Sequence, residues 1–70
     1  MSYPYRLSII KSKGGYVDWF QNSFEALLNE FPHISVDDRL YEQYYDVMLT
    51  RELIGFKSEA DAMMFILKWN

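Results

Sequence analysis

A few side chains of this 70-residue chain have types that suit acid–base or metal chemistry. His33 is the sole histidine, and it follows Pro32 in a segment that we predict to be a loop. A catalytic histidine needs an orienting carboxylate and a nucleophile beside it. Asp37 and Asp38 are near enough in sequence to reach His33, but no second histidine or cysteine accompanies them. We therefore expect an exposed loop histidine, no metal or cofactor, and no enzymatic activity.

Acidic side chains are concentrated in the middle of the chain, and Arg39 is the only base there. The acids of residues 17–50 are Asp18, Glu25, Glu30, Asp37, Asp38, Glu42 and Asp46. A calcium loop alternates oxygen ligands around a glycine turn, a pattern that these acids lack. Charge at a helix start and along a solvated strand edge explains them more simply. The net charge of -3 and this acidic middle also disfavour general nucleic-acid binding.

Bases dominate the first sixteen residues, where Arg6, Lys11 and Lys13 are the only charged side chains. Gly14 and Gly15 follow between an expected strand and an expected helix, where a phosphate-binding loop would lie. The glycine–lysine signature of such loops is absent, so we interpret the two glycines as a flexible turn. The basic N-terminal edge supports an alternative function, that of a structural or nucleic-acid-associated protein.

The spacing of apolar residues predicts two strands. Strict alternation over residues 5–11 indicates a strand with Tyr5, Leu7 and Ile9 on its buried face. Residues 53–57 form a short apolar run that follows a predicted hairpin turn over residues 50–52. Both strands need partners, because a two-stranded sheet of this size is marginal in water.

Two helices are also predicted. The first begins with Asp18 as its cap, and it ends near Phe31 because the residue before Pro32 disfavours helical angles. Its apolar stripe consists of Phe20, Phe24, Leu27, Leu28 and Phe31. The last helix begins after Ser58, which can cap it, and runs to the C-terminal residues. Its sheet-facing stripe consists of Ala62, Phe65, Ile66 and Trp69.

Residues 35–49 fit two descriptions. In a helix capped by Ser35, one stripe holds Val36, Leu40, Tyr44 and Val47. In a strand from about Leu40 to Leu49, one face holds Tyr41, Tyr45, Val47 and Leu49, and one helical turn at residues 36–39 can precede it. We prefer the strand, since the tyrosine- and valine-rich composition favours extended structure and the sheet otherwise has only two short strands.

The resulting order is strand, helix, strand, strand, helix, over a single domain of residues 1–70. Two helices on one face of such a sheet give an α+β sandwich, the ferredoxin-like arrangement without its last strand. No apolar run approaches the roughly 20 residues of a membrane helix, and the first residues lack the features of a signal peptide. We expect a cytoplasmic protein without a membrane partner.

The C-terminal segment F-K-S-E-A-D-A-M-M-F-I-L-K-W, residues 56–69, resembles the ending of small proteins of tailed bacteriophages. Those proteins end in a strand closing on Phe, an acidic helix start with Asp-Ala, and Phe-x-Leu-Arg/Lys-Trp. The opening Tyr5-Arg6-Leu7 strand and the helix that contains Trp19 are similar in kind, whereas Lys68 stands where Arg is commoner. The resemblance implies a viral origin, a compact α+β fold and a location in the host cytoplasm. It implies no catalytic residue.

A row of tyrosines, Tyr41, Tyr44 and Tyr45, lies among the central acids. With Tyr5 and Phe56 on neighbouring strands it resembles the stacking platforms of RNA-binding proteins, but bound phosphates would meet carboxylates. Core packing or protein contact is therefore favoured. The expected partner-binding residues are Asp37, Asp38, Tyr41, Glu42, Tyr44, Tyr45 and Asp46.

This acidic and aromatic surface leads to our main functional hypothesis. We expect a non-enzymatic phage accessory protein that binds and modulates a host protein, most simply by inhibiting it. Because rows of carboxylates can occupy a basic nucleic-acid groove, a host nuclease, polymerase or defence protein is the expected target.

Self-association is a further expectation. Met63, Met64 and Leu67 make the last helix more apolar than one sheet face requires. The predicted sheet also has an open edge, and such edges are usually paired, covered or blunted. We therefore predict a two-fold homodimer.

Overall fold

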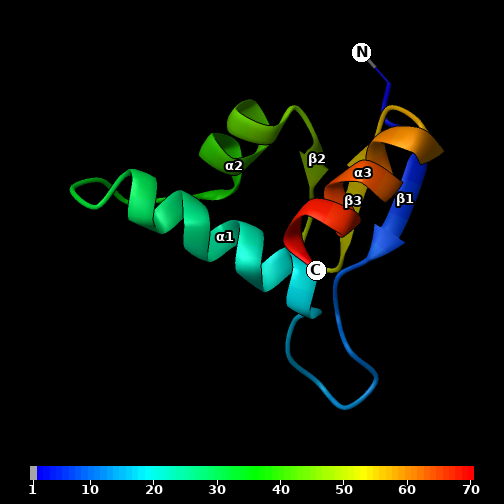
Figure 1. The fold of residues 1–70 in the computed structure, drawn as a ribbon, viewed down its shortest axis with the longest axis horizontal. Coiled ribbons are helices and arrows are strands. Elements are labelled where there is room, and N and C mark those ends of the chain that lie inside the picture. The colour runs from blue at the N-terminus through cyan, green and yellow to red at the C-terminus, as the bar shows by residue number, and fades with distance from the viewer. Residues whose placement is uncertain (1) are drawn as a thin grey trace.

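Residues 2–70, which the computed structural model describes, form a three-stranded antiparallel sheet and three helices (Figure 1). The elements are β1 (Tyr5–Ser8), α1 (Asp18–Glu30), α2 (Asp38–Tyr45), β2 (Met48–Leu49), β3 (Leu53–Phe56) and α3 (Glu59–Trp69). The predicted α+β class is confirmed. Within the described residues, no helix has the length and apolar character to cross a membrane.

The sheet has the order β1-β3-β2, and β3 is antiparallel to both neighbours. Tyr5 lies opposite Phe56, while Leu7 and Leu49 flank Ile54 on its two sides. Because directly opposite residues share a face, these side chains form one apolar surface, which α3 covers (Figure 1). The buried core consists of Ile9, Phe20, Leu27, Tyr41, Val47, Leu49, Ile54, Phe56 and Ala62.

Helix α1 packs on α3 and extends beyond the sheet (Figure 1). Trp19 meets the ring of Phe65 edge-on, with 6.1 Å between centroids, and the Asn22 side-chain amide donates to the Trp69 carbonyl at 2.8 Å. These contacts bring the first and last helices together, although 28 residues separate their ends.

The connection from β1 to α1 is a short hairpin. Ile9 is 1% exposed and continues the inward alternation beyond the end of β1. Ile10 then bridges to Tyr16, and Gly14 and Gly15 have φ angles of 92° and 80° that favour glycine. The two glycines therefore form a turn, as predicted.

Helix caps were predicted with mixed success. Ser58 caps α3 as expected, since its hydroxyl accepts from the Asp61 N–H at 3.2 Å. The predicted cap at Asp18 is wrong, because extended pairing continues through Val17 and places Asp18 in the first turn of α1. The Asp18 carboxylate instead pairs with Lys11 at 3.1 Å and ties the hairpin to α1.

The preferred strand over residues 40–49 is wrong. Residues 38–45 form α2, and only Met48 and Leu49 add to the sheet, as β2. The cap is Asp37 rather than Ser35: its carboxylate accepts from the Leu40 N–H at 2.9 Å. Asp46 ends the helix with a left-handed φ of 55°, a conformation that aspartate tolerates better than most residues.

Candidate functional site

The tyrosines that were expected to face a partner hold α2 against α1. Tyr41 is 0% exposed, and its hydroxyl lies 2.6 Å from the Ser23 Oγ. Since the Ser23 hydroxyl donates to the Phe20 carbonyl at 2.7 Å, Tyr41 is the donor to Ser23. The Tyr45 hydroxyl donates to the Ser23 carbonyl at 2.6 Å. Tyr41 therefore belongs to the core, which corrects its predicted place on an exposed surface.

Burial also affects how these tyrosines ionise. Loss of solvent raises the pKa of Tyr41 well above its usual value of 10.0. Burial, and then the neighbouring Tyr44, raise the pKa of Tyr45 to about 12. Both hydroxyls therefore stay protonated and remain donors to Ser23 at neutral pH. Tyr44 is 50% exposed, and its ring packs edge-to-face with Phe31 and Tyr45.

Three of the acids predicted to bind a partner make contacts within the fold. Besides the cap at Asp37, the Glu42 carboxylate accepts from the Leu49 N–H at 2.8 Å and joins α2 to β2. The Asp46 carboxylate accepts from the Lys57 ammonium and from the Tyr3 hydroxyl, and these two bonds lower the pKa of Asp46. These contacts use part of the carboxylate surface that the hypothesis gave to a partner.

Asp38 lies on the rim of a groove of about 560 Å³. The groove lies between α1, the hairpin before it and the turn that joins β2 to β3. Its apolar floor consists of Ile9, Phe20, Phe24 and Leu49. The rest of its lining consists of Gly15, Tyr16, Gln21, Glu25, Asp38, Thr50 and Arg51. We call this the α1 groove.

The rim of the α1 groove carries charged side chains that form no ion pair among residues 2–70. The ion pairs of residues 2–70 are Lys11–Asp18 and Lys57–Asp46, so Glu25, Asp38 and Arg51 face solvent or a ligand without an ion-pair partner there. Tyr16 is 47% exposed beside them. An apolar floor under two carboxylates suits an apolar side chain that has a cationic neighbour.

Sequence reasoning found Asp38 but missed Tyr16, Glu25 and Arg51 as site residues. Glu25 was noted only as one of the central acids, because the apolar stripe of α1 gives no sign of what lies beside it. The β2–β3 turn brings Arg51 to this position, and the hairpin brings Tyr16. Only the folded chain combines these segments.

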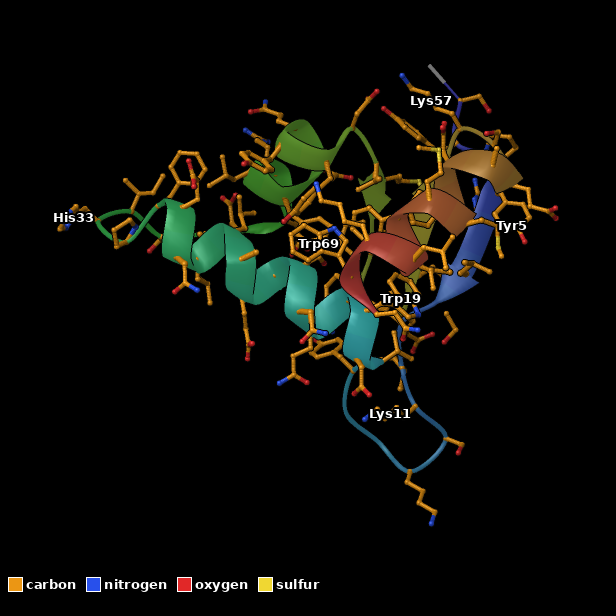
Figure 2. The ribbon with its side chains drawn as sticks, in the orientation of Figure 1. Tyr5, Lys11, Trp19, His33, Lys57 and Trp69 are labelled. Carbon is orange, nitrogen blue, oxygen red and sulfur yellow. The ribbon has the colours of Figure 1, made fainter. Side chains whose placement is uncertain are left out.

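The other residues considered from the sequence lie elsewhere. Figure 2 shows His33 at the outer tip of the connection between α1 and α2, and no cluster of three metal-ligating side chains occurs in the part of the chain that the structure describes. Met63, Met64 and Leu67 are exposed on α3.

The basic residues of the alternative hypothesis do not form one free patch. Lys11 already pairs with Asp18, and Lys13 extends from the hairpin turn. Arg6 lies opposite Gly55 on the other face of the sheet from the core. These positions give less support to nucleic-acid binding than the α1 groove gives to protein binding.

Comparisons with protein-family models, with curated proteins and with solved structures found no match. The chemistry of the α1 groove is therefore the basis for inferring a function.

Proposed function

We propose that this chain is a small accessory protein that binds a partner protein through the α1 groove. The bound segment would carry an apolar side chain next to a lysine or arginine. The observation that carries the proposal is the apolar floor beneath two carboxylates that have no ion-pair partner among residues 2–70. The proposed activity is binding without catalysis.

The likeness of the C-terminal segment to phage proteins makes a host protein the expected partner. Glu25 and Asp38 would then occupy a basic site of that protein and inhibit it, in the way that a complementary charged surface competes for a nucleic-acid groove. Of the residues first expected to bind a partner, the proposal keeps Asp38 in the groove and leaves Tyr44 as an exposed neighbour on α2.

The sheet topology supports a finer proposal about the fold, that of a ferredoxin-like sandwich without its last strand. Since β1 and β2 are both antiparallel to β3, they run parallel to each other with β3 between them. Two parallel strands separated by a third strand and joined through a helix form a split βαβ unit. The additional helix α2 before β2 departs from that pattern.

Short peptides test the proposed function directly. We expect a peptide with one tryptophan between two lysines to bind, and its copy with two glutamates to bind far more weakly. Nuclear magnetic resonance of the labelled protein should place the shifts at Tyr16, Phe24 and Arg51. Shifts that fall outside the groove, or equal binding of both peptides, would overturn the proposal.

Charge reversal provides the matched variants. The double variant Glu25→Lys, Asp38→Lys should reverse the preference between the two peptides. Glu30→Lys makes the same kind of charge change on α1, outside the groove, and should leave the preference unchanged. In nuclease-treated host lysate, the double variant should lose a partner protein that Glu30→Lys retains. Recovery of nucleic acid alone would favour the alternative function.

A further inference from the structure

The outward side of α3 is apolar and uncovered. Met63 is 50% exposed, Met64 70% and Leu67 73%. With Ala60, which is also exposed, they stand at positions i, i+3, i+4 and i+7 and so form one continuous stripe on the helix. We call Ala60, Met63, Met64 and Leu67 the outer strip. In Figure 1, α3 lies between the sheet and the viewer.

Two opposite charges border the outer strip on the same flank. Asp61 and Lys68 are seven residues apart, which is close to two helical turns, so they lie on one side of the strip at its two ends. Neither has an ion pair among residues 2–70. The Lys68 ammonium lies over the Trp69 ring, 5.1 Å from its centroid.

The positions of Asp61 and Lys68 favour a second, antiparallel copy of α3 as the partner of the outer strip. When a helix packs antiparallel on its own copy about a two-fold axis, equal flanks face each other with their directions reversed. Asp61 of each chain then faces Lys68 of the other, and the axis passes close to Met64. A parallel pair would instead bring Asp61 toward Glu59 of the second copy, which is a repulsive contact.

We propose that two copies of this chain associate through an antiparallel pair of α3 helices, which buries the outer strip and forms two Asp61–Lys68 pairs between the chains. One helix face is smaller than a standard interface of ~800 Å² per partner, so the dimer should form in the micromolar range. None of the four residues of the outer strip lines the α1 groove, so the proposed interface and the groove share no residue.

Cysteine cross-linking tests the geometry, because the native chain has no cysteine. Met64→Cys should form a disulfide-linked dimer on oxidation, since the two copies of residue 64 meet near the axis. Ala60→Cys should not, because its two copies lie about 12 Å apart along the helices. Failure of Met64→Cys to cross-link, or equal cross-linking of both variants, would overturn the proposal.

Sedimentation equilibrium tests the charges. Lys68→Glu should weaken the dimer about tenfold, because two attractions become two repulsions. Lys13→Glu makes the same charge change in the hairpin, away from α3, and should leave the dimer affinity unchanged. Circular dichroism confirms that both variants fold. A native chain that stays monomeric at high micromolar concentration, or equal effects of the two variants, would overturn the proposal.

Discussion

At the residue scale, Ser23 organises the packing of α2 on α1. It is 0% exposed, its hydroxyl contacts both Phe20 and Tyr41, and its carbonyl accepts from Tyr45. A small polar residue thus satisfies two tyrosine hydroxyls at once. The consequence is a polar contact inside an otherwise apolar core, where a missing partner is costly.

We predict that Ser23→Ala lowers the free energy of unfolding by about 1–3 kcal/mol, because it leaves the buried Tyr41 hydroxyl without an acceptor. Tyr41→Phe should cost less, since Ser23 keeps its bond to the Phe20 carbonyl. Urea denaturation measures both changes, with the exposed Ser35→Ala as control. A loss in Ser23→Ala no larger than in the control would contradict this role.

Ionisation of the same tyrosines predicts a loss of stability at high pH. Their folded pKa values are raised above 10.0, so above that pH the unfolded chain releases protons that the folded chain retains. The free energy of unfolding should therefore be unaffected by these groups below pH 10.0 and fall as pH rises toward about 12.

Denaturation at a series of alkaline pH values measures this slope. Tyr45→Phe should make the slope shallower, because one raised pKa is removed. An unchanged slope in that variant would show that Tyr45 ionises alike in both states.

At the scale of elements, α2 depends on contacts at its two ends as well as on its packing against α1. Asp37 supplies the cap, Asp46 ends the helix in a left-handed conformation, and Glu42 joins it to β2. Its eight residues are too few for a helix that is stable alone. Caps and packing on α1 must therefore stabilise it.

We predict that Asp37→Ala lowers the free energy of unfolding by ~1 kcal/mol, because the Leu40 N–H loses its acceptor. Asp37→Asn retains a capping oxygen and should restore most of the loss. Asp38→Ala is the matched control, because it removes the neighbouring carboxylate but no cap. Equal effects at residues 37 and 38, measured by thermal or urea denaturation, would argue against a helix that begins here.

At the scale of the whole molecule, ion pairs contribute little to stability. The two ion pairs found among residues 2–70 are both exposed, and exposed pairs contribute little. In the proposed function, the acids of the α1 groove that have no ion pair among residues 2–70 attract cationic groups, within a chain of net charge -3. If the α3 dimer forms, it presents two such grooves, so a multivalent partner would bind with avidity.

We predict that added salt weakens peptide binding in the α1 groove but has little effect on the stability of the fold. Between low and physiological ionic strength, the dissociation constant of a lysine-containing groove peptide should rise several-fold, because salt screens exposed charges. The free energy of unfolding should change much less over the same range. Fluorescence titration and urea denaturation measure the two quantities. A salt-independent dissociation constant would show that apolar contact alone drives peptide binding.

The sequence by itself determined the α+β class, the type and central residues of β1, α1, β3 and α3, and the cap at Ser58. Alternation of apolar residues indicates a strand and helical spacing of apolar residues indicates a helix, and both patterns can be recognised within one segment. Each of these four segments shows only one of the two patterns. Residues 40–49 carry both signals, because Tyr41 and Tyr45 lie on one face of a strand and also on one side of a helix. The helix is favoured by a contact distant in sequence, because Ser23, 18 residues before Tyr41, accepts a hydrogen bond from the Tyr41 hydroxyl.

The α1 groove could not be predicted from the sequence, because it too depends on contacts between residues that are distant in sequence. Glu25, Asp38 and Arg51 belong to three segments, and no spacing along the chain relates them. The outer strip of α3 is an intermediate case. Its apolar pattern can be recognised in the sequence, but its exposure depends on which face of α3 packs against the sheet. Local chemistry therefore specifies elements, whereas a site formed by several elements exists only once their packing brings them together.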